Sequence, residues 1–334
     1  MSFITFLPSE FDHYNLRSYN RRRGIRYLQV EVTTRCNLSC PSCIHGQNGI
    51  EPKTLSVEKF TEIVEGIPTL QCISFVGMGE ALLFPKISEL VAFCNKRSIK
   101  TAITTNGTVG QKRLNEAVRS GLDKLTISID GHNDETFSYA RGGAKLSTVL
   151  KFAATAVELS THTNVEIWGG ITLSRHNIKN LKEIISMIAD TGIYNIYVES
   201  IHHWGYDFTL NDLSIFSLDY TYVTEKILES CEFAKSRSIA LHIFDYERIF
   251  SKGIENYTRC GWPVDATVLR ADGSVAPCCI QLQGDDRVSF GNVHTSKLND
   301  IWLSRDYSNF ASSSLSGEAP QYCQKCIYRA EFGE

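Results

Sequence analysis

Residues 26 to about 245 alternate between short strand-like runs and longer helix-like segments, and this alternation limits the fold more than any other feature. Repeated β-α units build a parallel sheet with helices outside it, because each helix returns the chain to the same edge of the sheet. The strand-like runs are 26–33, 71–76, 100–104, 124–129, 165–173, 195–200 and 239–243, and the helix-like segments are 56–67, 85–97, 111–120, 145–158, 178–191 and 222–237. The pattern predicts an α/β protein built on a partial (β/α)6 barrel, with its site at the carboxyl ends of the strands.

The composition of the sequence changes after about residue 250, where the strand-like and helix-like segments become shorter and Gly, Asp, Ser and Cys become more frequent. A segment so rich in loops needs an additional stabilising element, such as a bound metal cluster, to stay folded. We therefore expect an N-terminal segment at 1–25, the barrel at 26–247, and a small cluster-binding α+β or loop-rich domain at 248–334.

The composition of the chain excludes several classes of partner. The 334 residues carry a net charge of −3 without a long basic run, so nucleic acid is not expected as a partner. No stretch approaches the ~18 apolar residues of a membrane span, and the N-terminus lacks a signal-peptide pattern. Eleven cysteines without a secretory signal indicate a reducing, cytoplasmic location. Cys72, Cys94 and Cys231 fit small, buried apolar groups.

Cys36, Cys40 and Cys43 form a C-x3-C-x2-C triplet directly after the strand-like run 27–33. Three thiolates hold three corners of a cubane [4Fe-4S] cluster, whereas a closed electron-transfer cluster has four cysteine ligands. The missing ligand leaves one iron open for a substrate or cofactor, as at other catalytic metals. A zinc site that takes His45 as its fourth ligand is the alternative.

The triplet resembles the cluster motif of the radical S-adenosylmethionine (radical SAM) enzymes. In that family the open iron binds the amino and carboxyl groups of SAM, and an electron from the cluster cleaves SAM to a 5′-deoxyadenosyl radical. The resemblance covers about residues 26 to 330. It implies a SAM-binding [4Fe-4S] cluster, SAM itself, and a reducing electron donor such as flavodoxin or ferredoxin.

Gly77-Met78-Gly79-Glu80 ends the second strand-like run, where radical SAM enzymes carry a Gly-Gly-Glu-Pro-like segment that binds the SAM amino group. Gly77 and Gly79 allow the backbone to approach a ligand closely, and the Glu80 carboxylate suits an ammonium group. Met78 and Ala81 depart from the commonest form of the motif. On its own, such a segment is usually an ordinary strand-to-helix turn.

Polar residues also end the third and fourth strand-like runs. Asn106 follows the third run, Ser128 lies in the fourth, and Arg141 follows shortly afterwards. They resemble the segments by which the family holds the SAM ribose and carboxylate, with Ser128 as a hydroxyl ligand and Arg141 paired with the carboxylate. Each alone is typical of a turn or a surface arginine. On successive strands they favour one shared ligand.

A second cysteine group contains Cys260, Cys278, Cys279, Cys323 and Cys326. It resembles the SPASM/twitch extension of radical SAM enzymes, which holds auxiliary [4Fe-4S] clusters. No cysteine follows Cys326, which departs from the longer SPASM pattern and fits the twitch form with one auxiliary cluster. The resemblance assigns Cys260, Cys278, Cys323 and Cys326 as ligands of that cluster. A zinc ribbon held by the same four cysteines is the alternative.

Cys279 is left over, because adjacent cysteines do not easily bind two corners of one cubane. It packs as an inert thiol, replaces Cys278 as a ligand, or donates a hydrogen atom to a substrate radical. The last of these is the sharper hypothesis and gives Cys279 a catalytic role, because a thiol S–H bond is weak enough to quench a carbon radical.

Residues on and after the last barrel strands are candidates for a substrate pocket. The segment 202–207 is rich in His and aromatic residues, and Trp168 and Glu199 lie on strands. Such side chains suit stacking and hydrogen bonding to a sugar or nucleoside. A packed loop explains them equally well.

These observations predict a radical SAM enzyme that abstracts hydrogen from a carbon of a small polar metabolite, such as a sugar, aminocyclitol or nucleoside natural product. The outcome is epimerisation, which Cys279 favours, or dehydrogenation. One alternative is a maturase of a ribosomal peptide, forming an epimerised residue or a thioether, although only about 25 residues precede the first strand. A non-catalytic iron-sulfur or zinc protein is a further alternative, but it does not require Glu80, Asn106, Ser128 or Arg141.

Overall fold

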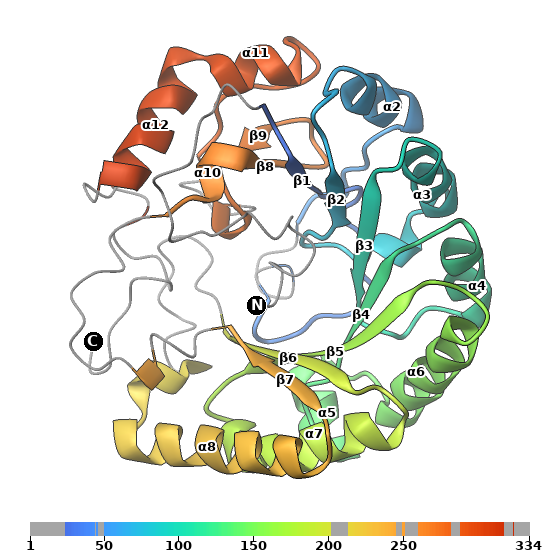
Figure 1. The fold of residues 1–334 in the computed structure, drawn as a ribbon, viewed down its shortest axis with the longest axis vertical. Helices are drawn as coiled ribbons and strands as arrows, with labels where there is room; N and C mark the ends of the chain where they lie inside the picture. Colours follow the sequence, from blue (N-terminus) through green and yellow to red (C-terminus); the bar gives the residue numbers. More distant parts are fainter. Residues whose placement is uncertain are drawn as a thin grey trace.

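The computed structural model describes residues 24–43, 45, 50–201, 213–244, 249–250, 260–281, 288–316 and 323. Within these residues, one curved sheet has nine strands in the order β7-β6-β5-β4-β3-β2-β1-β8-β9 (Figure 1). The strands are β1 (Tyr27–Val30), β2 (Cys72–Phe75), β3 (Lys100–Thr105), β4 (Lys124–Ser128), β5 (Glu166–Leu173), β6 (Asn195–Ser200), β7 (Ala240–Ile243), β8 (Ala266–Leu269) and β9 (Val275–Ala276). Only β9 runs antiparallel to its neighbour among them, which confirms the predicted α/β fold with a parallel, partly closed barrel.

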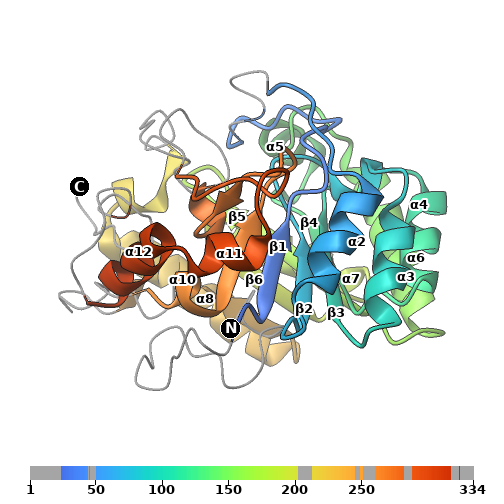
Figure 2. The same cartoon turned by 90° about the horizontal axis from the view of Figure 1, so that it is seen from above.

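Helices cover the outer face of the sheet (Figures 1 and 2). They are α2 (Val57–Glu65), α3 (Ile87–Asn95), α4 (Gln111–Arg119), α5 (Asp134–Ala140), α6 (Leu146–Ser160), α7 (Leu181–Asp190) and α8 (Tyr220–Ser236). In α2, Phe60, Ile63 and Val64 are buried on one face, and the Ser56 side chain accepts a hydrogen bond from the amide of Lys59, as expected of an N-cap. The helices therefore bury an apolar stripe against the strands.

Successive side chains along each strand point alternately into the core under the helices and into the barrel interior. Leu28 and Val30 of β1 lie in the core under the helices, whereas Gln29 between them lines the barrel interior. Every residue of β1 is buried because helices cover one face and the closed interior covers the other. The interior positions at the carboxyl ends are therefore the ones available to a ligand.

Two local details differ from the sequence pattern. The helix expected from Pro85 begins at Ile87, because the short 3-10 helix η4 (Ala81–Leu83) and the turn after it occupy the preceding residues. Helix α5 was absent from the pattern, since seven residues are too few to show a clear period. Its start is fixed by a capping box between Asn133 and Thr136.

The C-terminal segment joins the sheet of the barrel. Strand β8 pairs with β1 in parallel, with Tyr27 beside Ala266. The segment also holds α10 (Trp262–Asp265), α11 (Leu298–Leu303) and α12 (Arg305–Ser316). Trp302 and Tyr307 are fully buried there, with ring centroids 4.8 Å apart. The boundary expected near residue 248 thus separates two parts of the sequence that share one sheet.

None of the helices in the described part of the chain is both long and apolar enough to cross a membrane.

Candidate active site

The carboxyl ends of the parallel strands surround a cavity of about 240 Å³. Residues of the cysteine loop, of β1 to β6 and of the C-terminal segment line it. Ten of the residues singled out in the sequence line this one cavity: Cys36, Cys40, Cys43, Gly77, Gly79, Glu80, Asn106, Ser128, Arg141 and Cys279. The fold therefore brings together side chains that lie more than 200 residues apart.

The cysteine loop lies at one side of the cavity. The amide of Cys43 donates to the carbonyl of Cys40 at 3.0 Å, which closes a turn between the second and third thiols. Asn106 Nδ2 lies 3.9 Å from Cys36 Sγ, so an amide N–H points at a thiol that the cluster would hold as a thiolate. Three thiols lining one cavity, with an amide donor beside them, fit a [4Fe-4S] cluster with one open iron.

The zinc alternative gains no support from the geometry. Among the described residues, no three His, Cys, Asp or Glu side chains converge closely enough to share a single metal ion. A cubane cluster is larger than one ion and holds its thiolates further apart, so the triplet is compatible with it.

The Gly77–Glu80 turn packs directly against the backbone that carries the cysteines. A Cβ atom on Gly79 would lie 2.2 Å from the carbonyl oxygen of Thr33 and 2.7 Å from that of Arg35. The amide of Glu80 donates to the same Arg35 carbonyl at 2.9 Å. Gly79 is thus required for contact between two protein segments, a role that the sequence motif did not indicate.

Glu80 joins three segments through its carboxylate. Oε1 accepts from the amide of Leu82 at 3.1 Å and from Thr105 Oγ1 at 2.8 Å, and Oε2 accepts from the amide of Asn106 at 2.7 Å. The side chain is buried and still borders the cavity. Its expected contact with the SAM amino group stays a prediction, while its role in holding the end of β3 is visible.

Arg141 enters the cavity from the end of α5. Its Nη2 lies 2.6 Å from Asp130 Oδ2, and both side chains are largely buried. The other Asp130 oxygen accepts from the amide of Thr172 at 2.7 Å. Asp130 therefore fixes the guanidinium beside Cys40, in the cavity where the resemblance expects a carboxylate.

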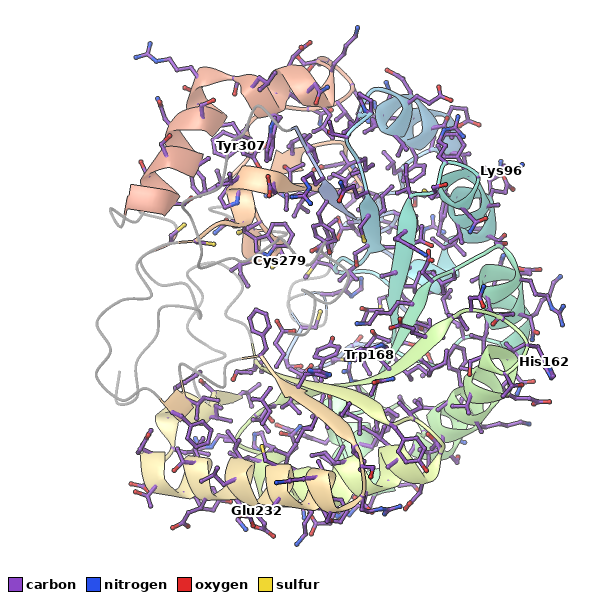
Figure 3. The ribbon with its side chains drawn as sticks, viewed as in Figure 1. Lys96, His162, Trp168, Glu232, Cys279 and Tyr307 are labelled. Atoms are coloured by element: carbon purple, nitrogen blue, oxygen red, sulfur yellow. The ribbon has the colours of Figure 1, made fainter. Side chains whose placement is uncertain are left out.

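The second cysteine group divides into two parts. Cys260, Cys278 and Cys323 do not line the cavity, whereas Cys279 does, and Cys326 lies outside the described residues. Cys260 is held to α12, because its amide donates to the carbonyl of Ser314 at 2.8 Å. Figure 3 shows Cys279 on the inner side of the C-terminal segment. Of these two adjacent cysteines, Cys279 lines the cavity and Cys278 does not.

One buried carboxylate links the SAM-motif turn to the C-terminal segment. Glu31 Oε1 accepts from the amide of Met78 at 2.8 Å, and Oε2 accepts from the amide of Ala271 at 3.2 Å. Burial raises the pKa of Glu31 to about 7, against the lowering effect of these two amides and of Arg270. Arg270 in turn donates to the carbonyls of Gln281 and Val288.

Some residues expected at the pocket are elsewhere, and others were not expected. Glu199 lines the cavity, but Trp168, which is labelled in Figure 3, does not. The Trp168 indole donates to Glu166 Oε2 at 3.1 Å, and Lys124 Nζ lies 3.6 Å from the centroid of its ring. The segment 202–207 lies outside the described residues.

The sequence did not single out four other residues that line the cavity: Gln29, Tyr197, Phe244 and Trp262. Only the alternation along β1 and β6 could have indicated the first two.

Two family models match the chain. The radical SAM superfamily matches residues 30–188, and an iron-sulfur cluster-binding domain of the SPASM type matches residues 260–327. The chain therefore belongs to the radical SAM superfamily and has a C-terminal SPASM domain. SAM, a SAM-binding [4Fe-4S] cluster and an auxiliary iron-sulfur cluster are its cofactors, as the resemblance implied.

Relatives of two kinds resemble the chain. It is 25% identical over 332 residues to the tungsten-containing aldehyde ferredoxin oxidoreductase cofactor-modifying protein of Pyrococcus furiosus, covering 91% of this chain and 88% of that protein. It is 31% identical over 148 residues to a GTP 3′,8-cyclase of Syntrophomonas wolfei, covering 42% of this chain and 45% of the cyclase. That second likeness involves less than half of either protein.

The solved structure of Streptococcus suis SuiB bound to S-adenosylmethionine shares the fold. Its TM-score is 0.71 at 15% sequence identity, over 91% of this chain and 71% of SuiB. At this level of identity the likeness concerns the fold alone.

Proposed function

We propose that this radical SAM enzyme abstracts a hydrogen atom from a carbon of a small polar metabolite and that Cys279 returns a hydrogen atom, so that the carbon is epimerised. The observation that carries the proposal is the position of Cys279, which lines the same cavity as Cys36, Cys40 and Cys43 but belongs to the C-terminal segment. A thiol there approaches the substrate from a part of the protein other than the cysteine loop.

The side chains divide the work of holding the cofactors. Cys36, Cys40 and Cys43 would hold the SAM-binding cluster, and Cys260, Cys278, Cys323 and Cys326 the auxiliary one. The SAM site would be formed by Gly77, Gly79, Glu80, Asn106, Ser128 and Arg141. Bound SAM and its cluster supply the 5′-deoxyadenosyl radical that abstracts hydrogen. The protein positions the substrate carbon and excludes water.

The step at Cys279 balances in atoms and electrons. Its S–H bond breaks as a new C–H bond forms on the substrate radical, which leaves a thiyl sulfur. One electron and one proton then restore the thiol, and we propose reduced flavodoxin or ferredoxin in a reducing cytoplasm as the electron source. Dehydrogenation is the alternative outcome, in which the substrate radical would pass one electron to the auxiliary cluster and lose one proton, and Cys279 takes no part.

One of the comparisons with known proteins supports the proposal that the substrate is a small molecule. The Pyrococcus relative, which aligns with most of both chains, is named as a cofactor-modifying protein. A ribosomal peptide remains the runner-up substrate.

The test measures deuterium in the product. Anaerobically reconstituted protein is incubated with SAM and reductant in D₂O, with host extract separated into small-metabolite and peptide fractions. We expect the metabolite fraction to stimulate 5′-deoxyadenosine formation and its product to gain deuterium. Cys279→Ala should still form 5′-deoxyadenosine but lose the deuterium, whereas the control Cys231→Ala, on α8, should keep both. Full deuterium incorporation by Cys279→Ala would refute the hydrogen-donor role, and stimulation by the peptide fraction alone would favour the runner-up.

A further inference from the structure

We infer that Asn37, Asn106 and Thr108 form a hydrogen-bonded network that raises the reduction potential of the SAM-binding cluster. The network directs an amide N–H of Asn106 at the thiolate of Cys36. It joins the cysteine loop to the turn that follows β3, although Cys36 and Asn106 are 70 residues apart in sequence. The inference goes beyond the function proposed above and does not depend on Cys279, because it concerns only the cluster held by the first three cysteines.

The orientation of the Asn106 side-chain amide follows from its neighbours. Its Oδ1 accepts from the backbone amide of Thr108 at 2.9 Å and from Thr108 Oγ1 at 2.6 Å. Because a backbone N–H only donates, the atom that faces it must be the carbonyl oxygen, and Nδ2 must point the other way. Nδ2 donates to Asn37 Oδ1 at 3.0 Å and lies 3.9 Å from Cys36 Sγ. The fold therefore fixes a donor, and not an acceptor, beside the first thiol.

The side chain of Thr108 closes the network. Its hydroxyl donates to Asn106 and accepts from Asn37 Nδ2 at 2.7 Å, so that the three side chains hold one another. An asparagine side chain has two N–H donors and one oxygen with two lone pairs. All four are used at Asn106, by Asn37, by Cys36 and twice by Thr108. Asn106 would therefore contribute to the SAM site through the thiolate that it holds, and not by direct contact of its side chain with SAM.

The backbone of the turn after β3 holds Asn106 in place. The amide of Asn106 donates to Glu80 Oε2 at 2.7 Å, and the amide of Gly107 donates to Thr105 Oγ1 at 3.1 Å. Gly107 has a φ of 69°, and a Cβ there would lie 2.9 Å from the Val149 side chain, so the turn requires glycine. Asn106 itself is only 8% exposed. A donor fixed in this way needs little reorganisation when the charge beside it changes.

A hydrogen bond to a cysteine ligand changes the reduction potential of an iron-sulfur cluster. Reduction adds one electron, and the thiolates share the added negative charge, so an N–H donor stabilises the reduced cluster more than the oxidised one. The Asn106 donor would therefore favour transfer of one electron to the cluster from reduced flavodoxin or ferredoxin. Without the donor, the equilibrium constant for reduction should fall about tenfold, which corresponds to about 59 mV for a one-electron couple.

The test is a redox titration of the anaerobic, cluster-loaded full chain, followed by electron paramagnetic resonance. The signal that changes when SAM is added belongs to the SAM-binding cluster, and the auxiliary cluster is the internal reference. Asn106→Leu, which keeps the size of the side chain, should lower the potential of the SAM-binding cluster by about 59 mV and leave the other unchanged. Thr108→Val should lower it by less. The control Asn115→Leu, which removes a bond to the Gln111 carbonyl on α4, should shift neither.

Two results for Asn106→Leu would overturn the inference. One is a wild-type potential in the iron-loaded variant, and the other is an equal shift of both clusters, which would indicate a general change of structure. If Asn106→Leu does not load iron, Thr108→Val decides, and a wild-type potential in that variant overturns the inference as well. No substrate is present in these titrations, so their outcome is independent of the reaction proposed above.

Discussion

Arg141 is held in the cavity by Asp130, with 2.6 Å between Nη2 and Oδ2 and little exposure of either side chain. Because Asp130 also accepts from the amide of Thr172, the position of the guanidinium depends on the end of β5. Asp130 directly follows the strand-like run 124–129, but its role as the support of Arg141 becomes clear only from the structure.

Asp130→Asn should therefore weaken SAM binding and lower stability. The substitution leaves a buried guanidinium without its counter-charge, a change that costs about 3–5 kcal/mol in other proteins. We expect the Kd for SAM to rise about tenfold or more, together with a lower unfolding temperature. Equilibrium binding of labelled SAM and thermal unfolding measure the two effects.

Asp190→Asn is the matched control, because Asp190 pairs with Arg237 at 2.9 Å on the surface. Exposed pairs contribute little, so this variant should behave like the wild type. Unchanged SAM affinity in Asp130→Asn would mean that Arg141 keeps its position without Asp130, or that it does not contact SAM.

Gly79→Ala should prevent assembly of the site. The added Cβ would lie 2.2 Å from a backbone oxygen of Thr33, so either the turn or the cysteine loop must move. Overpacking of this kind costs about 1–3 kcal/mol or more. We expect a lower unfolding temperature and reduced iron in the reconstituted protein. Gly110→Ala serves as the control, because nothing lies within 4 Å of a Cβ at that position and it should be neutral. Normal iron content in Gly79→Ala would contradict the packing argument.

Much of the site could be predicted from local sequence. The strand-like runs 71–76, 100–104 and 124–129 match β2, β3 and β4 within one or two residues, and the polar residues that follow them share one cavity. Strand ends of a parallel sheet meet at one edge, so order along the chain was enough.

The long-range supports of the site could not be predicted in the same way. The amide of Ala271 donates to Glu31 across 240 residues of sequence. The four-residue β8 gave no period that would place it beside β1. Such contacts depend on which edge of the sheet the C-terminal segment joins, and no local pattern contains that information.

Glu31 should make stability depend on pH. Its pKa is about 7 in the folded protein and near 4.5 when exposed, so the folded state binds the extra proton between these values. The contribution of Glu31 is then fully present below about pH 4.5 and is lost as pH rises through 7, by an amount on the order of 3 kcal/mol. We expect the unfolding temperature of the wild type to fall relative to Glu31→Gln between pH 5 and about 7.5. A constant difference between the two proteins across that range would show that Glu31 does not titrate there.

Cys278 and Cys279 should differ in their effect on iron. Cys279 lines the cavity and Cys278 does not, so Cys278 is the one expected to bind the auxiliary cluster. Cys278→Ala should retain about half of the iron of the wild type, because only the auxiliary cluster is lost, whereas Cys279→Ala should retain nearly all of it. Iron and sulfide per chain, with electron paramagnetic resonance of the reduced protein, measure the outcome. The reverse result would make Cys279 a ligand, and a thiolate bound to iron has no S–H bond to give to a substrate radical.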